Sequence, residues 1–260
     1  MEIKVINKTK VMFPVKEKYC EEDIFVTVDI PTYDGTITDD FTRELDDFLT
    51  GNVTTYKNDR ITELKCGFSY NTSIEELDLP NVITVAHRAF AGATKLKKVN
   101  IPNAETLGIN AFGSTTVLEN ALLWNVVSTE NQCFQSSGIR VLIAPKLQSV
   151  GTQFCNGCSN LEIAVLDSVT TMQGGMGFYN CRALKAVIIK QADVVPPLTT
   201  NVFQASSVAT GTGYVYVPES LIEQYKVATN WSSIASQIKG LNEIPQDILD
   251  ELEALGWMLN

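Results

Sequence analysis

Cys155 and Cys158 form a C-x-x-C pair, a spacing that can serve metal binding or redox chemistry. A zinc site needs a second such pair, and the sequence has none. Cys158 and Cys181 lie 23 residues apart, which leaves two alternatives open: a stack of reduced thiols or a disulfide. Cys20 and Cys66 have no partner that the sequence identifies. We therefore expect no metal site at these cysteines.

Histidine chemistry rests on a single residue, His87, in the stretch VAHRAF. A nucleophilic triad requires a histidine base in most of its forms, but an exposed turn residue is the plainer interpretation of His87. The glycines at 174–177 and the stretch TGTG at 210–213 lack the Lys-Ser/Thr of a phosphate loop. A group of acids matches no calcium loop and reads as a solvated helix face: Asp34, Asp39, Asp40, Asp46 and Asp47. We expect no enzymatic activity and no cofactor.

The composition narrows the classes of partner. The 260 residues carry 30 acids against 20 bases, a net charge of -10. Nucleic acids and anionic membranes both require a positive face, so neither is expected as a partner. No segment approaches the roughly 20 apolar residues that span a bilayer. The opening MEIKVINKTKVMFPVKEKYC does not resemble an export signal, so either the chain is not exported by this route or a signal was trimmed.

An internal repeat organises most of the chain. One aromatic position recurs in steps of 22, 22, 22, 21, 23 and 25 residues, with a cysteine in its fifth place: Phe68, Phe90, Phe112, Phe134, Cys155, Phe178 and Phe203. A period of 20 to 29 residues is typical of a solenoid, in which no unit buries its apolar side alone. Stretches such as VNIP alternate like a half-buried strand, and Pro102 ends the strand because proline cannot donate to a ladder.

The stretch from Leu96 to Leu118, with IPN at 101–103 and AF at 111–112, resembles the BspA-like (treponemal type) leucine-rich repeat. The resemblance covers about residues 51–240 and implies a non-catalytic adhesion or host-interaction protein. Three residues depart from the proline of the pattern: Trp124, Asp167 and Lys190. The N-terminal segment KYCEEDIFVTVDIPTYDGTI is similar to proteins of phages and prophages of gut Firmicutes. A phage structural or receptor-binding protein is therefore the second interpretation, and an enzyme is a distant third.

The predicted architecture is an α/β leucine-rich-repeat solenoid of about seven coils, with one short parallel strand per coil and helical caps. Residues 1–50 are expected to form a small β module and a capping helix over 39–50. The solenoid follows over 51–213, and the last strand and a cap over 214–240. Residues 241–260 form a separate helix in which Ile248, Leu252 and Leu255 make an apolar stripe.

The outward positions of the strands change from polar to apolar along the solenoid. If Val99 and Ile101 point into the coil, one outward column runs from Asp78 to Tyr216 and a second from Glu76 to Ala186. The candidate partner-binding residues are Leu122, Trp124, Val141, Ile143, Ile163, Val165, Ile188 and Tyr216. Such an apolar strip predicts a protein or host-surface ligand, a second copy of the chain, or a cover formed by the chain's own C-terminal helix. We expect the protein to act at a cell surface or on a virion.

Overall fold

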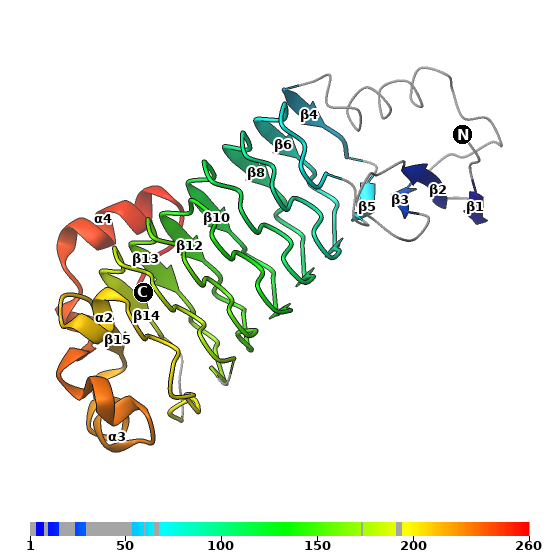
Figure 1. Ribbon diagram of the computed structural model, residues 1–260. Helices are drawn as coiled ribbons and strands as arrows, with labels where there is room; N and C mark the ends of the chain where they lie inside the picture. Colours follow the sequence, from blue (N-terminus) through cyan, green and yellow to red (C-terminus); the bar gives the residue numbers. More distant parts are fainter. Residues whose placement is uncertain are drawn as a thin grey trace.

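The computed structural model describes residues 4–7, 10–15, 24–29, 54–59, 61–64, 68–172, 174–190 and 194–259. These residues form an elongated solenoid with antiparallel strands at its N-terminal end and helices at its C-terminal end (Figure 1). The helix predicted over 39–50 lies outside the described residues, as do Cys20 and Cys66.

Each coil contributes one short strand to a common surface, which we call the strand face. Its strands are β4 (Thr55–Lys57), β6 (Glu76–Asp78), β8 (Lys98–Asn100), β10 (Asn120–Leu122), β12 (Val141–Ile143), β13 (Ile163–Val165), β14 (Ala186–Ile188), β15 (Tyr214–Val217) and β16 (Ile238–Gly240). All of these strands pair in parallel with their neighbours, as one sheet from β4 to β8 and a second from β10 to β16. The predicted fold class, a solenoid of short parallel strands, is confirmed.

A second row of strands lies on another side of the coils. It consists of β5 (Ile61–Leu64), β7 (Thr84–Val85), β9 (Thr106–Leu107) and β11 (Ser128–Thr129), which are parallel. The N-terminal strands β1 (Lys4–Asn7), β2 (Lys10–Val15) and β3 (Ile24–Asp29) are antiparallel, and β3 pairs with β5. The N-terminal strands therefore extend a sheet of the solenoid.

A column of aromatic rings fills the coil interior. From Phe68 to Phe134 the rings stack nearly parallel, with centroids 4.8 to 5.7 Å apart. Phe178 and Phe203 stack in the same way, and Phe203 meets Trp231 at 6.1 Å. Because each ring contacts the rings of the coils before and after it, neighbouring coils share one core.

The expectation that Cys155 interrupts this column is wrong, because the neighbouring Phe154 supplies the ring. The backbone N–H of Cys155 donates to the carbonyl of Gly177, so Cys155 does occupy the expected backbone position. The ring of Phe154 nevertheless lies between Phe134 and Phe178, edge-on to both at 84° and 87°. The Cys-Phe order of the preceding coil is thus reversed without loss of the ring.

A column of small polar side chains lies beside the rings. Thr115 donates to the carbonyl of Phe112 at 2.8 Å, and Ser206 donates to that of Phe203 at 2.6 Å. Two cysteine thiols do the same: Cys158 donates to Phe134 O at 2.9 Å and Cys181 to Cys155 O at 3.1 Å. The four cysteines within the described residues are free and buried, so of the two alternatives the structure shows stacked thiols.

Helices close the C-terminal end of the solenoid. They are α2 (Ser207–Thr210), α3 (Ile222–Val227), α4 (Gln246–Ala254) and the 3-10 turns η1 (Glu219–Leu221), η2 (Trp231–Gln237) and η3 (Leu241–Glu243). Tyr225 and Trp231 are buried against each other with ring centroids 4.9 Å apart. Trp231 Nε1 donates to the carbonyl of Pro196 at 2.8 Å, so the buried indole N–H is paired.

Candidate binding face

The strand register builds the strand face. Asp78 lies beside Asn100, whereas Leu122, Ile143 and Val165 lie side by side further along. In β8, the core contacts of Val99 and the burial of Ile101 confirm that these two residues face the coil. The outward face is therefore polar over β4, β6 and β8 and apolar from the end of β10 onward.

The eight predicted binding residues do come together, but most of them are not open to a partner. Leu122 and Trp124 are half-buried; the other six are at most 2% exposed: Val141, Ile143, Ile163, Val165, Ile188 and Tyr216. They form a cluster separate from the coil interior, which shows that they point outward as expected. Of the three occupants that the sequence left open, the structure shows the chain's own C-terminus, because Ile248, Leu252 and Trp257 belong to the same cluster.

The cover consists of residues 241–259, which we call the C-terminal segment. Its helix α4 lies over the C-terminal half of the strand face (Figure 1) and places Ile248 and Leu252 against the apolar outward positions. Beyond α4 the chain reverses at Gly256, whose φ of 93° is readily adopted only without a side chain. Trp257 then packs into the same cluster.

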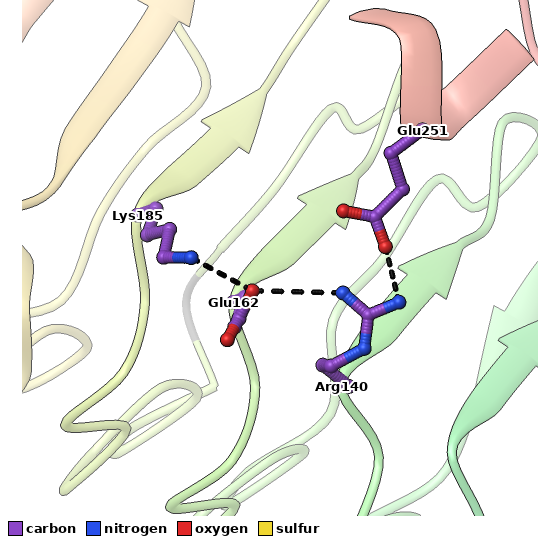
Figure 2. A network of polar contacts seen from close by, with 4 residues as sticks. All are labelled: Arg140, Glu162, Lys185 and Glu251. Atoms are coloured by element: carbon purple, nitrogen blue, oxygen red, sulfur yellow. Dashed lines mark hydrogen bonds and ion pairs between the residues drawn. The ribbon is translucent and has the colours of Figure 1, made fainter. Parts of the chain in front are cut away.

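Polar contacts flank this apolar contact. Arg140, next to β12, contacts Glu251 of α4 and lies 3.5 Å from Glu162, which in turn accepts from Lys185 at 2.9 Å (Figure 2). All four side chains remain partly exposed, so water screens the pairs. The network joins α4 to the beginnings of three coils.

A second polar contact lies at the other ends of the strands. Trp257 Nε1 donates to Asp167 Oδ2 at 2.8 Å, and Lys190 Nζ donates to the carbonyl of Met258 at 3.3 Å. Burial raises the pKa of Asp167, although the Trp257 hydrogen bond and the charge of Lys190 act in the opposite direction. The other oxygen of Asp167, Oδ1, is buried without a hydrogen-bond partner, so the segment holds a carboxylate that is only partly satisfied.

The N-terminal half of the strand face carries a groove of about 800 Å³, which we call the open groove. It crosses β4, β6, β8 and β10 and ends at Leu122, Trp124 and Leu255. On its floor Lys57 pairs with Asp78 at 2.7 Å, and Asn100 donates to the same carboxylate at 2.7 Å. These hydrogen bonds, that of Lys57 first, lower the pKa of Asp78, so the carboxylate stays charged.

The candidates for chemistry lie elsewhere. His87 Nε2 is 3.1 Å from Glu130 Oε2, with both side chains more than half exposed, and the same oxygen accepts the N–H of Ile109. Cys155 and Cys158 are buried in the coil. Within the part of the chain that the structure describes, no group of three His, Cys, Asp or Glu side chains is placed to hold a metal ion. The acids at 34–47 are outside that part.

Sequence reasoning did not identify Asp167 and Lys190 as contacts of the C-terminal segment, although a signal was present. Trp124, Asp167 and Lys190 are the three places where the repeat departs from its proline. In the structure Trp124 packs beside Gly256, Asp167 accepts from Trp257, and Lys190 contacts the carbonyl of Met258. Each departure thus occurs where a coil contacts the C-terminal segment.

Residues 62–185 match six copies of the model described as BspA type Leucine rich repeat region. The solenoid therefore has the fold of a leucine-rich repeat. This bacterial type of repeat is in general a protein-interaction module without catalytic activity. No curated protein matches the sequence of the chain.

Three solved structures of leucine-rich-repeat proteins are similar to the chain. A protein from Bacteroides ovatus is 19% identical with a TM-score of 0.46, over 71% of this chain and 53% of that one. One from T. pallidum is 16% identical with a TM-score of 0.39, over 79% and 81%. A leucine rich cell surface protein from Faecalibacterium prausnitzii is 15% identical with a TM-score of 0.34, over 75% and 61%. The chain thus spans about half the length of the first of these proteins.

Among the described residues, none of the helices has the length and apolar character needed to cross a membrane. The likeness of the N-terminal segment to phage proteins stays a prediction.

Proposed function

We propose that this protein is a non-catalytic binding module that attaches to a protein on a cell surface through the open groove of its strand face. The observation that carries the proposal is the groove itself, a concavity of about 800 Å³ over four adjacent coils. The same face is covered over the following coils, so the groove is the part of it on which a large ligand can dock.

The chemistry of the groove suits a protein surface. Lys98 and Glu76 carry opposite charges on adjacent strands, and Leu122 with Trp124 adds a half-buried apolar end. Tryptophan at the centre or edge of such a surface is a frequent source of binding energy, whereas charges set orientation and association rate. Short strands 4.8 Å apart hold these side chains on a rigid platform.

Binding of the fluorescently labelled full chain to cultured epithelial cells tests the proposal. Cells whose surface proteins have been removed by protease are compared with untreated cells. We expect saturable binding to untreated cells and loss of most of it after protease treatment. Equal binding to both would show that the ligand is not a protein, and no saturable binding would contradict attachment to this cell surface.

Two matched charge reversals locate the surface. Lys98 lies in the groove, whereas Lys95 is an exposed residue of the loop in the same coil. We expect Lys98→Glu to weaken binding at least tenfold and Lys95→Glu to leave it unchanged. An equal effect of the two variants would mean that binding follows net charge and that the groove is not the site.

A further inference from the structure

We propose that the C-terminal segment is a displaceable occupant of a second binding surface, and that a partner's amphipathic acidic helix takes the place of α4 there. The inference rests on the proposed function, because it extends the binding surface from the open groove across the covered half of the strand face. It also names the class of partner that this half selects.

The solenoid is complete without the C-terminal segment. The rings and aliphatic side chains inside the coils form one cluster, and no residue of α4 belongs to it. The residues beneath α4 form a second cluster, built from outward strand positions together with Ile248, Leu252 and Trp257. Release of the segment would therefore expose an apolar face and leave the coil interior intact.

α4 shows what kind of ligand the covered face binds. Ile248 and Leu252 stand four residues apart on one side of the helix and are at most 6% exposed. Glu251 contacts Arg140 at the edge, while Asp247, Asp250 and Glu253 belong to the same acidic helix. A partner's helix can bind this face as α4 does. It needs an apolar pair at i and i+4 and an acidic residue that reaches Arg140.

The contacts of the segment are suited to exchange. Arg140 retains Glu162 when Glu251 leaves, so release leaves no guanidinium without a carboxylate (Figure 2). Asp167 regains water at its unpartnered oxygen and loses the burial that raises its pKa. α4 itself has nine residues, and helices of that length are marginal in water without packing. The helical structure of the segment therefore depends mainly on its packing against the apolar face.

The covered face is continuous with the open groove. Leu255 follows α4 and lines the groove together with Leu122 and Trp124, which also pack at the margin of the covered cluster. A ligand in the groove therefore meets the C-terminal end of α4 directly. This contact gives a partner helix a starting point for replacing α4.

Hydrogen exchange of the unmodified full chain, followed by mass spectrometry, tests whether the segment opens by itself. We expect amides of 246–254 to exchange at least tenfold faster than those of 141–143 and 163–165, because local release does not require the coils to unfold. Equal exchange in all three regions would mean that the segment opens only when the whole molecule unfolds, and the proposal would be overturned.

A labelled synthetic peptide with the sequence of residues 241–260 tests what the face accepts. Leu252→Asp in the full chain removes its own α4 from the face, and Val227→Asp, at a position 80% exposed on α3, is the control. We expect the peptide to bind the Leu252→Asp chain at least tenfold more tightly than the wild-type or Val227→Asp chains. A peptide carrying Leu252→Asp itself should bind none of them.

Absence of peptide binding to a folded Leu252→Asp chain would overturn the proposal. Should this variant not fold, Leu252→Ala removes the apolar contact without adding a charge, and the same comparison decides. Neither measurement involves a cell surface, so a failure here leaves the Lys98→Glu result standing, and the reverse also holds.

Discussion

Trp257 and Asp167 are ninety residues apart in the sequence and are joined by a hydrogen bond of 2.8 Å from the indole nitrogen to Oδ2. Asp167 stands two residues beyond β13, at a position where the repeat usually has proline. The bond attaches the last residues of the chain to the middle of the solenoid. It is also the only hydrogen bond that the described side chains give to this half-buried carboxylate.

Trp257→Phe should loosen the C-terminal segment without disturbing the coils. The ring bulk is largely kept, but the half-buried carboxylate of Asp167 loses its side-chain donor, a change of about 1 kcal/mol. Limited proteolysis should show faster cleavage within 241–259. Met258→Ala is the control, because Met258 contacts Lys190 through its backbone carbonyl. Equal cleavage of the two variants would show that the hydrogen bond contributes nothing.

Val165→Asp should release the C-terminal segment and expose an apolar face. Val165 is fully buried beneath α4 but points away from the coil interior, so an aspartate there opposes docking and not the stacking of coils. We expect wild-type far-ultraviolet circular dichroism, rapid cleavage within 241–259 and an increase in mass on a sizing column. Val117→Asp, at an exposed position, should show none of these. Loss of the circular dichroism signal would mean that the covered face is needed for the coils to fold.

Phe154→Ala should lower the free energy of unfolding by as much as the removal of any other phenylalanine ring of the column. The ring of Phe154 lies 5.6 Å from Phe134 and 6.4 Å from Phe178, and its removal leaves a cavity that costs about 3 to 5 kcal/mol. Urea denaturation should give a similar loss for Phe112→Ala. Cys155→Ala, at the neighbouring buried position, removes one sulfur and should cost much less. A larger cost for Cys155→Ala would contradict the exchange of the two side chains.

The sequence was sufficient to predict the solenoid because the same pattern of apolar and aromatic residues recurs in each coil. The spacing of Phe90, Phe112 and Phe134 specifies stacking, and the alternation around Val99 and Ile101 specifies which side of each strand is buried. The outward register was correct for the same reason: a slip of one residue would have placed the charged side chain of Lys98 and the polar amide of Asn100 inside the coil. Period and polarity are local properties, and the sequence displays them directly.

The candidate site could be predicted only in part, because whether its residues are exposed depends on a contact with α4, which is distant in the sequence. The apolar outward positions of β12 to β15 indicate that something covers them, but they fit a partner, a second copy or α4 equally well. The sequence shows that Trp124, Asp167 and Lys190 depart from the proline of the repeat. The reason becomes clear only from their contacts with the C-terminal segment. Phe154 was missed because aligning the repeats matches backbone positions, and Cys155 occupies the matching position. The ring that fills the core comes from the residue before it.

The buried thiols should be inert in the folded protein. Cys133, Cys155, Cys158 and Cys181 are fully buried, and burial raises the pKa of Cys133, Cys155 and Cys181, which disfavours the reactive thiolate. For Cys158 burial acts in the same direction, but hydrogen bonds with Cys155 and Ser137 outweigh it and lower the pKa, so the inertness of this thiol rests on its burial away from the reagent. Iodoacetamide at pH 8 should label none of the four in the native chain and all four in urea, as read by peptide mass mapping. A Cys158 and Cys181 pair that stays unlabelled in urea until a reductant is added would contradict the free thiols of the structure.

Alkaline pH should release the C-terminal segment through Tyr216. Burial raises the pKa of this phenol to about 12, and the charges of Tyr214, Glu243 and Asp247 act in the same direction. A released segment would expose Tyr216 to water, where its pKa lies near 10. Since the pKa is higher when the segment is docked, the stabilisation is fully present below about pH 10 and is lost as pH rises from 10 to 12. Proteolytic cleavage within 241–259, measured with a protease active over this range, should increase between these pH values.

Tyr216→Phe separates this titration from other alkaline effects. The variant keeps the ring that β15 contributes to the covered cluster but has no phenolic proton to lose, so its cleavage should change much less between pH 10 and 12. Effects of alkaline pH on other groups are common to both chains and cancel in the comparison. Identical pH profiles for the two chains would mean that ionisation of Tyr216 does not release the C-terminal segment. The prediction would then be wrong.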